Sequence, residues 1–122
     1  MLEFQLELIP KQITKEDNIS IKFFFNNNTD NIIHLLSYQF NITNPSGFLK
    51  RFGEHSFYKI ISNSEVYEKE FNPVNAVKYY IQNDELAEYT FEVFISYLVY
   101  GEEEPKSIKA EAKLVLIWNY HF

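Results

Sequence analysis

The residue types that most often carry out chemistry are sparse in this chain, and their spacing matches no familiar site. There are three histidines and no cysteine. His34, His55 and His121 do not have the spacing of a zinc site, in which two ligands are commonly separated by about three to five residues. His34 has the apolar-face parity of its strand, which favours a histidine in the core or at its rim. We therefore expect no metal and no other cofactor.

The carboxylates and hydroxyls make no stronger case for catalysis. Glu102, Glu103 and Glu104 form a run typical of a solvated turn, and the alternating Asp and Asn ligands of a calcium loop are missing. Glycoside hydrolysis needs two carboxylates that face each other across a cleft, and the sequence does not place the glutamates between 54 and 70 well enough to test this. No nucleophile elbow or glycine-rich phosphate loop is present. We expect a non-enzymatic protein.

Length, composition and charge favour one folded domain, residues 1–122. Of its residues, 46% are hydrophobic and 18% aromatic, which supplies a core that disordered chains lack. The net charge of −6 argues against nucleic-acid binding and against attraction to anionic membranes. No apolar stretch reaches the about 20 residues that span a bilayer, and no secretory signal is visible. With no cysteine, these features indicate a cytoplasmic protein.

Apolar and polar residues alternate with a period of two through much of the chain, which is typical of β-strands. The alternation predicts strands near 2–9, 19–26 and 32–42. The third strand is expected to place these residues on one face: Ile32, Leu36, Tyr38, Phe40 and Ile42. The region 45–83 is less regular: short strands are predicted at 57–61 and 66–71, and 73–83 fits a strand or one helical turn.

The last third of the chain predicts a long antiparallel hairpin. Its strands, at 89–99 and 107–120, both alternate, and a short loop joins them. Directly opposed residues of an antiparallel pair share a face, so the register must pair core positions with core positions. A loop at 101–106 sets Phe91 opposite Leu116, and the same parity turns Trp118 and Tyr120 inward.

These patterns predict an all-β fold, a two-sheet antiparallel β-sandwich of about seven or eight strands. The stretch from Ile13 to Leu36 resembles the opening of immunoglobulin-like accessory and inhibitor domains, with a polar lead-in, an alternating strand, an Asn-rich turn and a second apolar strand. Similar openings occur in bacterial intracellular proteinase inhibitors and in amino-terminal domains of some secreted metallopeptidases. The resemblance covers about a fifth of the chain, and the Gly and Trp landmarks of those groups are absent after Ile42. It implies an immunoglobulin-like fold and a binding or inhibitory role.

Two surfaces are candidates for partner binding. Some apolar residues occupy positions that should face water: Phe24, Phe94, Leu98, Val115 and Ile117. A contiguous exposed patch of this kind usually marks an interface, unless residues 48–58 fold over it. The loop 45–53 concentrates aromatic and basic residues, which is the composition of binding hot spots. Its members are Phe48, Lys50, Arg51 and Phe52. The alternative is an edge strand whose phenylalanines point inward.

The sequence thus predicts a non-catalytic protein-binding domain, an adaptor or assembly module, that uses the apolar sheet face and the loop 45–53. Its partner is expected to be another protein or a second copy of itself. One alternative is an intracellular protease inhibitor that presents the loop 45–53 to an active site. Another is a carbohydrate-binding module, against which stand the missing secretion signal and the inward parity of Trp118.

Overall fold

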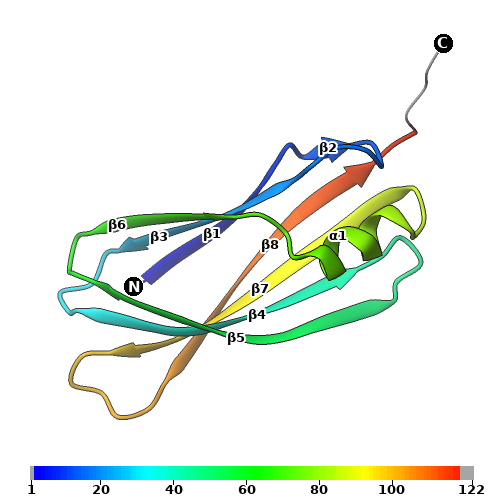
Figure 1. Cartoon of the computed structure of the whole chain (residues 1–122). Helices are drawn as coiled ribbons and strands as arrows, with labels where there is room; N and C mark the ends of the chain where they lie inside the picture. The colour runs from blue at the N-terminus through cyan, green and yellow to red at the C-terminus, as the bar shows by residue number, and fades with distance from the viewer. Residues whose placement is uncertain (1, 119–122) are drawn as a thin grey trace.

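The alternating segments form antiparallel strands in a computed structural model that describes residues 2–118. Within this range the chain forms eight strands and one short helix (Figure 1). In chain order they are β1 (Leu2–Ile9), β2 (Gln12–Ile13), β3 (Ser20–Asn27), β4 (Ile33–Thr43), β5 (Leu49–Ile61), β6 (Val66–Phe71), α1 (Asn75–Gln82), β7 (Ala87–Val99) and β8 (Lys106–Leu116). In the described part of the chain, no helix is long and apolar enough to cross a membrane.

The strands form two sheets that pack face to face, which confirms the predicted β-sandwich (Figure 1). One sheet has the order β1-β3-β6, and the other has the order β2-β8-β7-β4-β5. The chain crosses from the first sheet to the second at Pro10, whose peptide bond with Ile9 is cis. β2 then pairs in parallel with the end of β8, while the other strand pairs are antiparallel.

The core lies between the sheets and is rich in aromatic rings. Phe23 and Phe25 are almost fully buried on the inner side of β3. The ring of Phe4 stacks on Phe25 at 4.8 Å and meets Phe23 edge-on at 5.4 Å. Each such ring removes much apolar surface from water, which stabilises the fold by about 2–3 kcal/mol per side chain. Strict alternation along β3 therefore determines which of its side chains face the core.

The inward-facing positions of β4 change from odd to even residue numbers at Leu36. Before this residue Ile33 is buried, whereas after it the buried apolar side chains fall on even positions, as at Ile42. The register with β7 slips by one residue here, so an extra residue is inserted as a β-bulge. The prediction of one continuous face was wrong at the start of β4: Ile32 is 43% exposed, and His34 lies on the outer face.

The β7–β8 hairpin has the predicted faces but a different register. Phe91 lies opposite Ala112, four residues before the predicted Leu116. The last pair of the ladder is Tyr97 with Lys106, because the chain leaves the pairing earlier than expected. Instead of pairing with β8, the backbone N–H of Tyr100 donates to the carbonyl of Ile32 at 2.8 Å.

The middle of the chain forms an edge strand and a helix. β5 begins at Leu49, so most of the expected loop 45–53 is strand, paired with β4 from Thr43 onward. α1 is a helix of eight residues that buries Val77 and Ile81, which lie one turn apart. It lies at the end of the sandwich where β5 begins (Figure 1). This helix and the start of β5 create the site described next.

Candidate protein-binding surface

A shallow groove lies between the start of β5 and the outer side of α1. It encloses about 890 Å³ and is lined by Lys50, Arg51, Phe52, Asn75, Ala76, Tyr79, Tyr80, Asn83 and Asp84. The groove contains Lys50, Arg51 and Phe52 of the predicted segment 45–53. The α1 residues were missed, and the only sequence signal for them was the spacing of Val77 and Ile81 on an eight-residue helix.

Core contacts fix the floor of the groove. Phe52 points inward, and its ring lies 6.0 Å from that of Phe40 and 6.0 Å from that of Tyr80. Tyr80 in turn meets Tyr89 edge-on at 6.5 Å. Tyr79, the neighbour of Tyr80 on α1, turns outward and is 70% exposed. The groove therefore has an aromatic floor that is held in place from below.

The turn between β4 and β5 is held by one buried side chain. Asn44 is 9% exposed, and its Oδ1 accepts hydrogen bonds from the N–H groups of Ser46 at 3.1 Å and Phe48 at 2.9 Å. Its Nδ2 donates to Asp84 at 3.0 Å, which ties the turn to the segment after α1. Phe48 is 71% exposed at the end of this turn. The turn thus presents an aromatic ring from an ordered backbone.

Two cations at the groove are free to meet a partner. Within residues 2–118, neither Lys50 nor Arg51 forms an ion pair, whereas four of the other lysines do: Lys22, Lys106, Lys109 and Lys113. Arg51 is also the single arginine of the chain. Burial, with a smaller effect from Asp84, raises the pKa of Tyr80, so its hydroxyl stays neutral at physiological pH. Aromatic surface beside an unpaired arginine is suited to a carboxylate-bearing ligand.

The apolar residues expected on one sheet face do not share one. Phe24 lies on the outer side of the β1-β3-β6 sheet, between Gln5 and Glu68. The others belong to or follow strands of the second sheet: Phe94, Leu98, Val115 and Ile117. Of the five residues, Ile117 is the most exposed, at 36%, and the rest are half-buried. The segment 48–58 does not cover this face, because β5 pairs with β4 within the same sheet.

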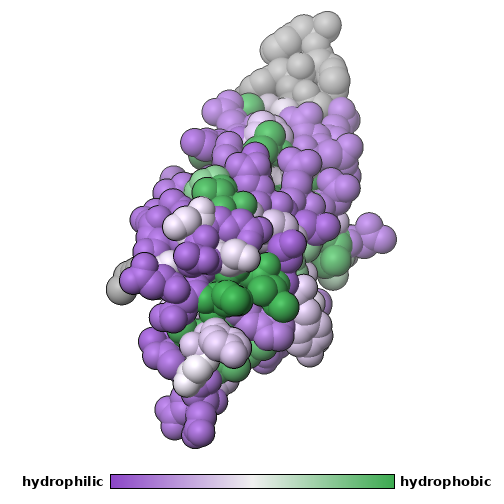
Figure 2. Space-filling view, turned by 90° about the vertical axis from the view of Figure 1, so that its left-hand side faces the viewer, coloured by the Kyte–Doolittle hydropathy of each residue, from purple (hydrophilic) through white to green (hydrophobic). Residues whose placement is uncertain are grey.

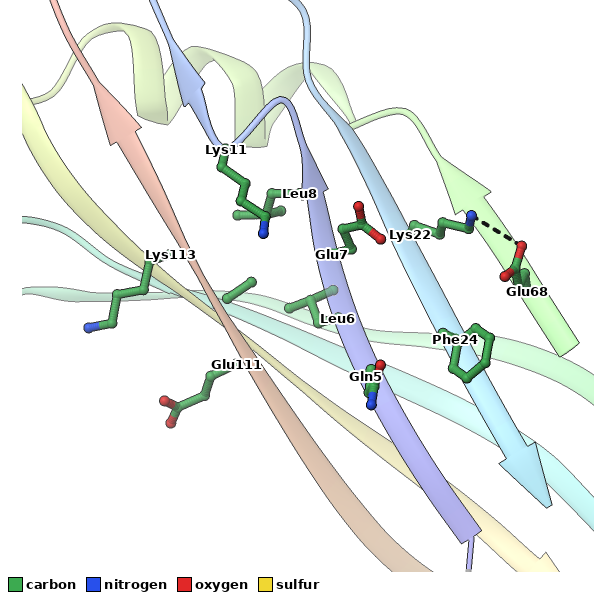
Figure 3. A pocket seen from close by; sticks show the side chains of 11 residues that line it. Gln5, Leu6, Glu7, Leu8, Lys11, Lys22, Phe24, Glu68, Glu111 and Lys113 are labelled. Carbon is green, nitrogen blue, oxygen red and sulfur yellow. Dashed lines mark ion pairs between the residues drawn. The ribbon is translucent and has the colours of Figure 1, made fainter. Parts of the chain in front are cut away.

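Phe24 instead lines a second hollow, between β1 and β8 (Figure 3). It encloses about 790 Å³, and Leu6 and Leu8 project toward it from β1. Its charged rim is largely neutralised by the chain itself. Lys22 lies 3.1 Å from Glu68, and Lys113, on the opposite side, lies 3.2 Å from Glu88. This hollow offers a ligand less unbalanced charge than the groove at α1.

Trp118 was expected to face inward, and this prediction was wrong. β8 ends at Leu116, and Trp118 beyond it is 65% exposed. The strand ends where its pairing with β2 ends, at the hydrogen bond from Ile117 N–H to Ile13. The inward tryptophan therefore no longer counts against a carbohydrate-binding module, and Tyr120, expected on the same face, lies outside the described residues.

Of the remaining histidines, His55 lies within the described residues. His55 is an exposed residue of β5 whose ring lies 5.1 Å from that of Tyr38. His121 lies outside the described residues. Between residues 2 and 118, no group of three or more His, Cys, Asp or Glu is arranged to hold a metal ion.

Comparison with known proteins adds fold-level information. No protein-family model and no curated protein sequence matches the chain. The chain is similar to the CARDB domain of the PF1109 protein from Pyrococcus furiosus, determined in complex with di-metal ions, with a TM-score of 0.61 and 10% identity over 96% of this chain and 88% of that one. It is also similar to the structural genomics target SoR45, with a TM-score of 0.61 and 15% identity over 100% of this chain and 93% of that one.

A third similar structure is a much longer protein, the alkylpurine DNA glycosylase AlkC of Pseudomonas fluorescens bound to DNA with an abasic site analog. The TM-score is 0.53 at 15% identity, and the match covers 94% of this chain but 30% of that one. At these identities the similarity shows the fold alone. The chain is an immunoglobulin-like β-sandwich, as its residues 13–36 suggest.

Proposed function

We propose that this chain is a non-catalytic protein-binding domain whose binding site is the groove between β5 and α1. Its ligand is an extended protein segment that carries carboxylates beside an apolar side chain. The observation that carries the proposal is the position of Lys50 and Arg51, which have no ion-pair partner within residues 2–118, beside the exposed ring of Tyr79.

The strand next to the groove supports an extended ligand. β5 is the last strand of its sheet, so the backbone groups on its outer edge have no strand partner among residues 2–118. An extended segment can add to such an edge through backbone hydrogen bonds, while adjacent pockets select its side chains. Arg51 selects carboxylates because its guanidinium matches their geometry in a bidentate pair. The aromatic floor selects an apolar neighbour.

Peptide selection tests this proposal without a known partner. Random peptides displayed on phage are selected on the immobilised chain, and binding of the enriched peptides is measured by biolayer interferometry. We expect Asp or Glu next to an apolar residue in the enriched peptides, and at least a tenfold loss of affinity in the double variant Lys50→Glu, Arg51→Glu, since each lost charged contact costs about 1 kcal/mol or more.

The matched control is Lys11→Glu, Lys15→Glu, which changes the net charge equally at two exposed lysines outside the groove. This control should bind like the wild-type chain. Peptides without acidic residues, or equal losses in the two double variants, would overturn the proposal.

Protease inhibition is the second candidate, supported by the ordered β4–β5 turn. The backbone after Asn44 is pre-organised, and Phe48 is 71% exposed where a protease cleft could engage it. Pre-organisation of this kind reduces the entropy cost of binding. Inhibition of any member of a serine- and cysteine-protease panel, lost in Phe48→Ala and kept in Tyr79→Ala, would favour this function. The absence of inhibition across the panel would exclude protease inhibition as a function of this chain.

A further inference from the structure

A second exposed apolar surface, here called the end patch, lies at the far end of the larger sheet. It consists of Ile32, Tyr58, Ile60, Leu98 and Tyr100. Tyr100 and Tyr58 are 76% and 72% exposed, and Ile60 and Ile32 are 57% and 43% exposed. Figure 2, which views the end where the turns after β3, β5 and β7 lie, shows a compact group of hydrophobic residues among hydrophilic ones.

Strand pairing makes the end patch contiguous. Ile60 and Leu98 flank His34 from the two neighbours of β4, so these three side chains form one row across the outer face. The hydrogen bond from Tyr100 N–H to the Ile32 carbonyl brings the β7–β8 loop beside this row. A contiguous apolar surface on a soluble protein usually marks an interface.

The border of the end patch is acidic. Glu102, Glu103 and Glu104 directly follow Tyr100 and its neighbour Gly101, and Asp30 lies two residues before Ile32. Lys106 pairs with Glu102 at 3.2 Å. In the described part of the chain, Glu103 and Glu104 have no ion-pair partner, so the border keeps an excess of negative charge.

We propose that the end patch of one molecule docks into the α1 groove of a second copy of the same chain. The proposal rests on the proposed function for the groove and its unpaired cations, and it names as the partner a folded surface of a second copy in place of an extended segment. The two surfaces are complementary: one presents carboxylates around exposed apolar side chains, and the other presents Lys50 and Arg51 around an aromatic floor. The one carboxylate of the groove, Asp84, accepts a hydrogen bond from Asn44, so the two cations remain in excess there. Carboxylates without partners on one surface match cations without partners on the other.

The two surfaces lie at opposite ends of the same strands, which determines the type of assembly. β4 starts at the end patch with Ile33 and ends beside the groove with Thr43, a distance of roughly 33 Å at about 3.3 Å per residue. One molecule therefore cannot join its own surfaces. A head-to-tail contact uses a different surface on each molecule, and it grows into a ring or a filament.

Two blocked variants test the head-to-tail arrangement. The groove variant is Lys50→Glu, Arg51→Glu, and the end-patch variant is Tyr58→Glu, Tyr100→Glu, at side chains exposed enough to tolerate a charge. Sedimentation velocity is measured over about a hundredfold range of concentration, because mass action drives association. We expect wild-type mass to rise beyond twice the 14.6 kDa monomer, and each variant to remain monomeric alone.

An equimolar mixture of the two variants retains one intact contact. It should form a complex of two chains that does not grow further. Raising salt from about 0.05 to 0.5 M should weaken this complex about tenfold, because screening reduces the attraction between opposite charges. Circular dichroism of each variant confirms that it is folded. If the groove variant dimerises alone, two end patches pair symmetrically and the head-to-tail proposal is overturned.

A monomeric wild-type chain would also overturn this inference. In that case, acidic peptides that depend on Lys50 and Arg51 would leave the proposed function standing with a different protein as the partner. If the peptide selection failed as well, both the head-to-tail contact and the proposed function of the groove would be wrong.

Discussion

At the scale of single residues, Asn27 connects the turns at the end-patch side of the fold. It is fully buried, and its Nδ2 donates to the carbonyls of Asn31, Ile61 and Ser62 at 2.8, 3.1 and 3.0 Å. Its Oδ1 accepts from Thr29. One side chain therefore joins the turn after β3 to the turn after β5, and through them the two sheets.

We expect Asn27→Ala to lower the free energy of unfolding by about 3 kcal/mol, because it leaves buried carbonyls without donors. Asn28→Ala is the matched control. Asn28 is the next residue along the chain, and its side chain is exposed and makes one surface hydrogen bond, to Glu3. This variant should change stability by less than about 0.5 kcal/mol. Urea unfolding at neutral pH measures both. Similar values for the two variants would show that the buried network contributes little.

Because of Tyr89, we expect the stability of the fold to fall at alkaline pH. Its side chain is fully buried, and its hydroxyl donates to the carbonyls of Glu85 and Ile81. Burial above all, and then the charge of Asp84, raises its pKa above the ordinary value. A phenol that holds its proton more tightly when folded contributes fully below its unfolded pKa of about 10, and this contribution is lost as pH rises beyond that value.

We therefore expect Tyr89→Phe to cost about 1 kcal/mol at pH 7, from the lost hydrogen bond, and to reduce the fall in stability between about pH 9 and pH 11. The fall should not vanish, because burial also raises the pKa of Tyr38 and Tyr80. Urea unfolding at several pH values provides the measurement. Tyr58→Phe, at an exposed position, is the control and should retain the wild-type pH profile. An unchanged profile in Tyr89→Phe would contradict this assignment.

At the scale of elements, alternation in the sequence was enough to predict the sandwich. Strands such as β3 and β7 keep one parity throughout, because each buries one side against the opposite sheet. It was not enough for β4, where the bulge at Leu36 reverses the parity between Ile33 and Ile42. A bulge is one extra residue in a strand relative to its partner strand. It is therefore defined by the pairing of two strands, and the sequence of one strand alone does not identify it.

The register of the β7–β8 hairpin could not be predicted from the sequence, for a related reason. Parity allows every shift by two residues, and the choice among them depends on the loop. That loop is set by a distant contact, the hydrogen bond between Tyr100 and Ile32. The candidate groove has the same origin, because Arg51 and Tyr79 line one groove only when α1 packs at the start of β5.

The edge strand β5 carries charged side chains at positions that face inward. Lys50 and Lys59 take the inward-facing positions opposite Ile42 and Leu35 of β4. Lys59 Nζ lies 4.8 Å above the ring of Tyr67, so its charge remains near the gap between the sheets. Inward-facing charges on an edge strand oppose unselective strand pairing. A ligand of β5 must therefore supply charges that match these cations, which agrees with an acidic segment.

At the scale of the whole molecule, local stability should follow the position of each strand in its sheet. β3, β4 and β7 have a strand on both sides, whereas β5 and β6 have one on a single side. Exposed backbone hydrogen bonds open at lower free energy than those enclosed by neighbours. The α1 end, where the proposed site lies, is connected to the core chiefly through Val77, Ile81 and Phe52.

Hydrogen exchange followed by mass spectrometry measures this distribution directly. We expect amides of β4 and β7 to exchange at least about a hundredfold more slowly than those of β6, with α1 between them. Measured at low concentration, these rates describe the single molecule. At high concentration, slower exchange should appear both at the start of β5 and in the β7–β8 loop. The proposed head-to-tail contact covers the start of β5 on one molecule and the β7–β8 loop on the other. Slowing in only one of the two segments would contradict that contact, and exchange in β6 as slow as in β4 would contradict the link between strand position and stability.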